Sequence, residues 1–166
     1  MNHPKDPGGA TNMGVTISTW RAQGYDKDGD GDIDVDDLKL ITPQDAMMVL
    51  KKAYWDRWQA DRIISQSIAN LVVDWVWASG KHGITKVQEV LGVKQDGIVG
   101  NKTLSALNGS HSPSLFKAIW ERRERFIKGI KTYPTFGRGW MNRMNGIQYG
   151  KLICNGGKEI IYNDLR

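Results

Sequence analysis

The chain has 166 residues, which is enough for one ordinary hydrophobic core and too few to predict two large domains. Its apolar fraction of 40% and its seven Trp are typical of a globular protein and exclude wholesale disorder. The single cysteine, Cys154, excludes an internal disulfide. We do not expect it to be a catalytic thiol, because His3, His82 and His111 show no supporting pattern.

The net charge of +5 is unevenly distributed: residues 26–37 are acidic, whereas residues 122–131 and 138–143 are basic. Basic faces attract any polyanion, including a bacterial cell wall, but no nucleic-acid-binding motif accompanies them. We therefore expect solvated basic surfaces and no nucleic-acid partner. The longest apolar stretch, residues 68–78, is too short for a transmembrane segment. No signal peptide begins the chain, so action outside the cytoplasm would need another export device or an upstream start.

The first half of the chain predicts loops followed by a helix. Residues 1–14 are too rich in Pro and Gly for a helix, and residues 15–20 fit either a short strand or a first helical turn. Thr42-Pro43-Gln44-Asp45 is typical of a helix start, with Thr as the N-cap and an acid that reaches back to it. Apolar residues then recur at helical spacing over residues 46–58.

The second half predicts further helices and a short β element. A central buried helix is expected over residues 63–78, ending at Ser79-Gly80. Shorter or amphipathic helices are expected over residues 85–91, 103–107 and 114–131. The tail after Gly146 has the pattern of a hairpin around Asn155-Gly156-Gly157. The predicted fold class is thus mainly α, with a small β element, in one compact unit.

An acidic loop at residues 26–37 fits the twelve-position EF-hand pattern. Asp26, Asp28 and Asp30 occupy positions 1, 3 and 5, Gly31 allows the turn at position 6, and Asp32 would offer its backbone carbonyl at position 7. Asp34 would act through water at position 9, and Asp37 closes the loop at position 12. We expect these residues to bind Ca²⁺, with metal ligands Asp26, Asp28, Asp30, Asp32 and Asp37.

Two features shape the expected calcium chemistry. Position 12 is Asp rather than the usual Glu, so the shorter arm predicts weaker affinity or better tolerance of magnesium. The alternative is a solvated acidic loop, but seven aspartates this close would repel one another without an ion. The residues before Asp26 are too short and Gly-broken for the entering helix of a sensor, so we predict a structural clip.

Several motifs, in order, resemble the glycoside hydrolase family 108 N-acetylmuramidases, whose relatives include proteins described as secretion activators. The resemblance covers the chain to about Asn145 and includes the predicted peptidoglycan domain of the family. The matching segments are Asp6-Pro7-Gly8-Gly9-Ala10-Thr11-Asn12 with Gly14-Val15-Thr16, Tyr54-Trp55-Asp56, Asp74, Ser79-Gly80, residues 87–93, residues 96–104, Arg122-Arg123, Phe126 and residues 139–143.

The resemblance implies a lysozyme-like helical domain that acts on bacterial cell-wall peptidoglycan, in the periplasm or outside the cell. It implies a muramidase-like part over residues 1–80, a peptidoglycan-domain-like part over 81–145 and a separate tail over 146–166. Asp6 would stabilise charge or activate water, and Thr11 would orient that water. Asn12 would lie in the substrate cleft. Asp74 would bind substrate, although an acid inside an apolar helix also suggests a buried hydrogen-bond partner for a neighbouring loop.

The family places its general acid, a Glu, in a Glu-Gly-Gly-Tyr-like motif just before the opening loop. In this chain the first glutamate is Glu89. Either residues upstream of Met1 complete the motif, together with the helix that carries it, or the chain is a natural form without the acid. Three functions follow: a peptidoglycan glycan-strand hydrolase, a non-catalytic calcium-stabilised wall-binding module, and, with least support, a calcium-regulated interaction protein.

Overall fold

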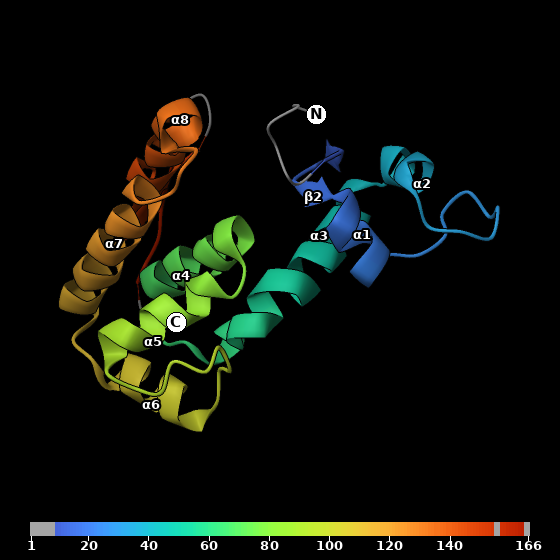
Figure 1. Cartoon of the computed structure of the whole chain (residues 1–166). Coiled ribbons are helices and arrows are strands. Elements are labelled where there is room, and N and C mark those ends of the chain that lie inside the picture. Colours follow the sequence, from blue (N-terminus) through green and yellow to red (C-terminus); the bar gives the residue numbers. More distant parts are fainter. Residues whose placement is uncertain (1–8, 155–156, 165–166) are drawn as a thin grey trace. The chain divides into compact units, whose positions relative to one another are not determined.

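The structure is a computed structural model that describes residues 9–154 and 157–164. It is mainly helical, and it divides into two compact units, Met1–Arg57 and Trp58–Arg166 (Figure 1). The sequence favoured one compact unit with a family boundary near residue 80. The division falls earlier because Trp58, Ala60 and Ile63 are buried in the second unit, where the Trp58 indole donates a hydrogen bond to the Gly83 carbonyl.

The first unit begins with a two-stranded hairpin and continues through short helices. Its strands are β1 (Thr11–Asn12) and β2 (Val15–Thr16). The helices are α1 (Ile17–Gln23), α2 (Val35–Leu40) and α3 (Pro43–Leu50), followed by a π-helical turn η1 (Lys51–Trp55). The 3₁₀ turn η2 (Asp56–Trp58) spans the boundary between the two units. The described helices here are short, so tertiary packing rather than helix propensity must hold them.

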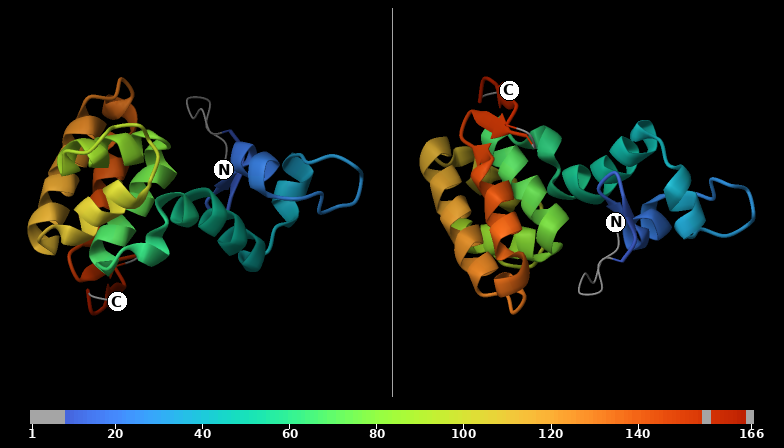
Figure 2. Two further views of the ribbon diagram at one scale, coloured as in Figure 1. Left: turned by 90° about the horizontal axis from the view of Figure 1, so that it is seen from below. Right: turned by 90° about the horizontal axis from the view of Figure 1, so that it is seen from above.

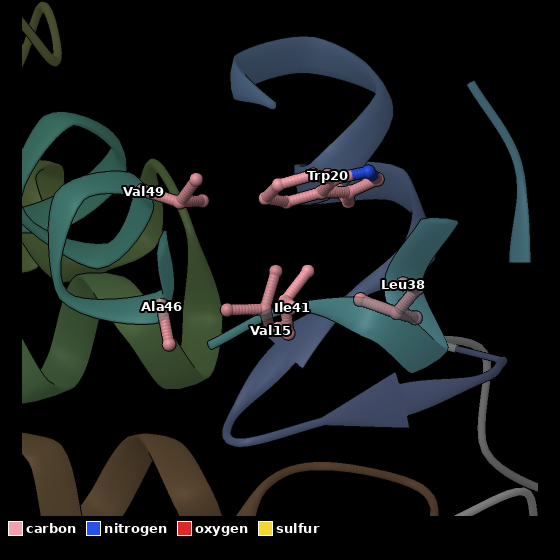
Figure 3. Close-up of a cluster of buried hydrophobic side chains, with 6 residues drawn as sticks. All are labelled: Val15, Trp20, Leu38, Ile41, Ala46 and Val49. Carbon is pink, nitrogen blue, oxygen red and sulfur yellow. The ribbon is translucent and has the colours of Figure 1, made fainter. Parts of the chain in front are cut away.

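A small apolar core joins these elements, and Figure 3 shows its side chains converging from the hairpin and all three helices. Trp20 and Val49 are fully buried at its centre, and the remaining members are Val15, Leu38, Ile41 and Ala46. The sequence predictions for the first unit are confirmed in part.

Residues 15–20 form both a strand and a helix, because Thr16 ends β2 and caps α1.

The helix start predicted at Thr42 is confirmed, with a capping box between Thr42 and Asp45. However, the α-helix ends at Leu50 instead of running to Trp58. Helix α2 was not predicted. It begins with its own capping box, in which the Asp34 and Asp37 side chains accept hydrogen bonds from each other's backbone N–H groups. The Asp-x-x-Asp spacing that indicates this capping box lies within residues 26–37, which the sequence predicted to be a metal-binding loop.

The second unit is a helical bundle with a short sheet. After the 3₁₀ turn η3 (Ala60–Arg62), its helices are α4 (Gln66–Ser79), α5 (His82–Leu91), α6 (Asn101–Gly109), α7 (Ser112–Lys128) and α8 (Tyr133–Asn145). Its strands are β3 (Ile147–Gln148), β4 (Lys151–Ile153) and β5 (Glu159–Ile161). No helix in the described part of the chain is both long and apolar enough to cross a membrane.

Helix α4 is central, as predicted, and packs against α5 and α7. Its buried side chains include Ile68, Leu71, Val72 and Trp75. A Cβ on Gly83 would lie 2.5 Å from the Val76 backbone nitrogen, so glycine permits the close approach of α5 to α4. Helix α8 was missed because Pro134, Gly137 and Gly139 lower helix propensity.

The tail forms a three-stranded antiparallel meander in the order β3-β4-β5, where the sequence predicted a two-stranded hairpin. The predicted pair corresponds to β4 and β5, with Leu152 opposite Ile160, while Asn155 and Gly156 lie outside the described residues. Strand β3 was missed because it has only two residues, and Ile147 pairs with Leu152. The meander leads the chain back to the start of α4.

Asp164 caps the N-terminus of α4 across nearly a hundred residues of sequence. Its carboxylate accepts hydrogen bonds from the Ser65 hydroxyl at 2.8 Å, the Ser67 backbone N–H at 2.9 Å and the Tyr149 hydroxyl at 2.7 Å. Its own backbone carbonyl accepts from the Gln66 N–H. A carboxylate at this end of a helix satisfies free N–H groups and complements the helix dipole. The tail is therefore part of the second unit's fold.

We predict that Asp164→Asn lowers the free energy of unfolding by about 1 kcal/mol, because a charged helix cap is lost. Denaturant unfolding of both proteins measures the difference. Glu159→Gln is the matched control: it removes a charge from an exposed ion pair of the same tail, and such pairs contribute little. Equal losses in the two variants would contradict the capping role.

The same substitution should give a defined pH dependence. Partial burial opposes ionisation of Asp164, but hydrogen bonds from Ser67, Tyr149 and Ser65 outweigh it and lower the pKa below its ordinary value of 3.8. A lowered pKa in the folded state stabilises the fold above the unfolded value, and this stabilisation is lost as the pH falls through the folded pKa. The stability difference between wild type and Asp164→Asn should therefore be full near neutral pH and should shrink below pH 3.8.

Candidate functional site

The hairpin that follows Asp-Pro-Gly-Gly holds two of the predicted site residues. Strands β1 and β2 are antiparallel, with Thr11 opposite Thr16 and Asn12 opposite Val15. Met13 and Gly14 form the turn, both with positive φ, which suits the right-handed twist of a two-residue hairpin. Asp6, the predicted catalytic carboxylate, lies outside the described residues.

Thr11 and Asn12 are both half-buried, and each has a defined partner. The Thr11 hydroxyl donates to the Gly9 carbonyl at 3.4 Å. The Asn12 side-chain amide donates to the Leu38 carbonyl at 2.9 Å, which ties the hairpin to helix α2. The Ile17 N–H also donates to the Ala10 carbonyl, so the loop entering β1 is anchored to the start of α1. The hairpin is thereby fixed from two sides.

The acidic loop lies between α1 and α2, and its carboxylates gather in two groups that could hold a metal ion. Asp26, Asp28 and Asp37 form one, while Asp32, Asp34 and Asp37 form the other, each with ligand atoms within 4.8 Å of one another. Asp37 belongs to both. Asp30 is in neither group found in the described part of the chain, and its carboxylate accepts from the Asp32 N–H at 3.1 Å.

Asp37 is fully buried at the base of this loop. Its carboxylate accepts hydrogen bonds from the backbone N–H groups of Asp34, Asp28 and Lys27, at 2.8, 3.0 and 2.6 Å, and these bonds hold the pKa of Asp37 below its ordinary value. At the exposed rim the effect reverses, since repulsion from Asp30 raises the pKa of Asp32. The loop therefore has one firmly ionised carboxylate below and crowded carboxylates above.

Short helices flank the acidic loop on both sides. Helix α1 ends at Gln23, just before Asp26, although it has only seven residues. Lys27 forms an ion pair of 2.8 Å with Asp45, whose carboxylate also accepts from the Tyr25 hydroxyl. The Lys27 bond is the main reason that the pKa of Asp45 lies far below its ordinary value. The loop's entry is thus anchored to the capping box of α3.

Asp74 belongs to the second unit and lies in an ion cluster between three helices. From α4, its carboxylate accepts from Arg123 of α7 at 2.8 Å and from Arg143 of α8, whose Nε lies at 2.8 Å. The Arg143 guanidinium also stacks 4.0 Å from the Trp77 ring centre. The sequence suggested a partner from a loop, but both partners come from helices.

Arg123 is the cluster member that the sequence did not identify. It was included among solvated basic residues, yet only 2% of it is exposed, and its burial lowers the pKa of the guanidinium. Its position between Phe116, Ile119 and Ile127 on the buried face of α7 was the available signal. Removing Asp74 would leave a buried charge without compensation.

A shallow groove in the first unit was not foreseen. It has a volume of about 510 Å³ and lies between α1 and the π-helical turn. The Tyr54 hydroxyl hydrogen-bonds with the Thr19 hydroxyl at 3.1 Å there, and other lining residues include Ser18, Gln23, Lys52 and Arg57. Such turns are frequent at functional sites, and this one contains Tyr54 and Trp55 of the Tyr-Trp-Asp segment, whose Asp56 begins η2.

Two family models match consecutive parts of the chain. The Glycosyl hydrolase 108 model matches residues 1–80, and the Predicted Peptidoglycan domain model matches residues 82–145. The boundary between these matches falls between α4 and α5, inside the second compact unit. A comparison with curated proteins gave no significant match.

A solved structure, SagA from Brucella abortus, is similar over most of both chains. It is 31% identical in sequence with a TM-score of 0.75, and the match covers 89% of this chain and 82% of that one. Sequence identity and shared fold over this length, together with the consecutive domain matches, show the family. The chain belongs to the glycosyl hydrolase 108 family and carries a peptidoglycan domain after its glycosyl hydrolase part.

Proposed function

We propose that this chain is a lysozyme-like N-acetylmuramidase domain that acts on the glycan strands of peptidoglycan at the bacterial cell wall. The observation that carries the proposal is the clamped hairpin. It carries Thr11, two residues after the Asp-Pro-Gly-Gly segment in the sequence, and is held by the bond from Asn12 to the Leu38 carbonyl. A fixed hydroxyl five residues after a carboxylate in the sequence suits the placement of an attacking water.

The proposed roles follow from what each side chain has available. Asp6 activates the water or stabilises the developing positive charge of the sugar, and the Thr11 hydroxyl orients the water. Asn12 contributes by fixing the hairpin, since its amide is already bonded to Leu38. Asp74 contributes by holding α4, α7 and α8 together, because both its oxygens accept from arginines.

The remaining catalytic group is the general acid. It must keep its proton near neutral pH, which requires a raised pKa. The first glutamate in the sequence, Glu89, is ion-paired with Arg122, and this bond lowers the pKa of Glu89. Glu89 is therefore unsuited to the role. The family resemblance assigns that role to a Glu placed before Asp6.

We predict that peptidoglycan is cleaved by a form in which a Glu-Gly-Gly-Tyr-like segment is joined before the opening loop, and not by residues 1–166 without that segment, because hydrolysis of the glycosidic bond needs a general acid. The measurement is release of soluble muropeptides, with calcium present, by both forms and by the extended form carrying Glu→Gln at its upstream acid. Cleavage by the shorter chain would show that the acid lies elsewhere and that the roles given to the opening loop are wrong.

A second candidate function is a calcium-stabilised module that binds the wall without cutting it, and the match of residues 82–145 to the Predicted Peptidoglycan domain supports it. The same experiment separates the two functions. If neither form releases muropeptides while both sediment with intact cell walls, the hydrolase proposal fails and the binding module replaces it.

Thr11 provides a test of the hairpin in whichever form cleaves. Thr11→Val should lower the cleavage rate about 100-fold with little change in wall binding, because the hydroxyl that orients water is removed. Thr11→Ser, which keeps a hydroxyl, is the matched control and should retain most of the activity. Equal losses in both variants would indicate a packing role for the threonine methyl group instead.

We further propose that the acidic loop binds Ca²⁺ as a structural clip. Its support is the pair of carboxylate groups that share Asp37, together with the helices on either side. A hard cation preferring many oxygen ligands would relieve the repulsion among the rim aspartates. The short Asp37 arm favours weaker binding than a Glu would give.

Calcium should raise the melting temperature of the chain, and a chelator should reverse the rise, because an ion that binds only the folded state stabilises it. Asp28→Asn and Asp37→Asn should each weaken calcium affinity by at least about tenfold. Asp36→Asn is the control, since Asp36 is exposed, pairs with Lys39 and lies in neither carboxylate group. Titration calorimetry with calcium and magnesium measures both ions, and an unchanged melting temperature in calcium would refute the clip.

A further inference from the structure

A second groove lies wholly within the second unit, on the side of α7 that faces the junction between α8 and β3. Its volume is about 470 Å³, a size suited to one or two sugar rings or a short peptide. Helices α7 and α8 run side by side in Figures 1 and 2. The groove is lined by Phe116, Lys117, Trp120, Glu121, Glu124, Asn145, Ile147, Gln148 and Tyr149.

Three aromatic rings form the apolar part of this groove, and the polar atoms of two of them are already bonded within the protein. The Trp120 indole N–H donates to the Met144 carbonyl at 3.2 Å. The Tyr149 hydroxyl donates to Asp164 at 2.7 Å, and the Tyr149 ring packs edge-on against Phe116 at 5.7 Å. Each ring is held in place, so the groove offers fixed carbon surfaces to a ligand.

The charged part of the groove is formed mainly by two carboxylates. Glu121 and Glu124 lie three residues apart on α7 and therefore share one side of the helix. Their side chains are 53% and 30% exposed, and each pairs at long range with a lysine of its own helix, at 3.9 and 3.4 Å. The Gln148 side-chain amide donates to the Asn145 carbonyl. The charged side chains that line the groove are Glu121, Glu124 and Lys117, so carboxylates outnumber the ammonium group and the lining has a net negative charge.

We propose that this α7 groove is a subsite for the glycan strand of peptidoglycan. A pyranose ring has apolar C–H faces that pack on aromatic rings, and it carries hydroxyl and acetamido donors that suit paired carboxylates. The carboxylates of stem peptides, like any phosphate polymer, would be repelled by Glu121 and Glu124. This inference rests on the proposed function for the choice of polymer, but it requires no cleavage.

The test uses the full chain and peptide-free glycan strands of alternating N-acetylglucosamine and N-acetylmuramic acid, in which each lactyl carboxylate is converted to an amide so that the strand is neutral. The double variant Glu121→Ala/Glu124→Ala should bind these strands about tenfold or more weakly, because two charge-assisted hydrogen bonds are lost. Glu159→Ala is the matched control, since Glu159 is half-exposed and pairs with Lys151 outside the groove, and its affinity should be unchanged. Circular dichroism confirms that each variant is folded.

Backbone amide chemical shifts give a second readout that needs no variant. Added strands should perturb residues 116–124 and 145–149; perturbations confined to other residues would overturn the assignment. Unchanged strand affinity in the double variant would also overturn it, while undiminished sedimentation with whole cell walls would leave the proposed function standing. Binding of isolated stem peptides in place of strands would refute the glycan class. Failure to bind either strands or whole walls would refute both proposals.

Discussion

The buried ion pair between Asp74 and Arg123 is the constraint on which the second unit depends. A guanidinium that is 2% exposed is costly to bury, and it is tolerated because a carboxylate on the neighbouring helix compensates it at 2.8 Å. Arg143 shares the same carboxylate and covers Trp77. One acidic side chain in an apolar helix thereby fixes how α7 and α8 pack on α4, and α7 carries the carboxylates and two of the rings of the proposed glycan subsite.

The same helix is fixed at its beginning by the chain's tail. Asp164 caps α4 and accepts from Tyr149, which in turn lines the α7 groove. The meander between these residues therefore links the helix cap to the groove wall. In the first unit a comparable link joins the acidic loop and the hairpin: Asp37 is followed directly by Leu38, whose carbonyl holds Asn12. Each unit therefore has a carboxylate that stabilises the fold and lies close to a candidate site. Asp37 lies next to the residue that holds the hairpin, and Asp164 binds a residue that lines the α7 groove.

The sequence predicted the elements with strong local signals. The capping box at Thr42, the central helix ending at Gly80, the helices α5 to α7 and the loop spacing of the aspartates all depend on neighbours within a few residues. It missed α8, whose Pro and Gly content opposes a helix, and β3, which is too short for a pattern. Family membership was also accessible, because it depends on motifs in linear order.

What the sequence by itself determined was therefore composition, local helix signals, the aspartate spacing and the family. The tertiary structure alone decided which distant side chains meet: Asp74 with Arg123 and Arg143, Asp164 with the start of α4, and three aromatic rings beside Glu121 and Glu124. These partners are separated by many residues in the sequence. A contact over such a separation produces no helical or strand periodicity from which it could be predicted. Their energies come from burial and geometry, which exist only after the helices have packed.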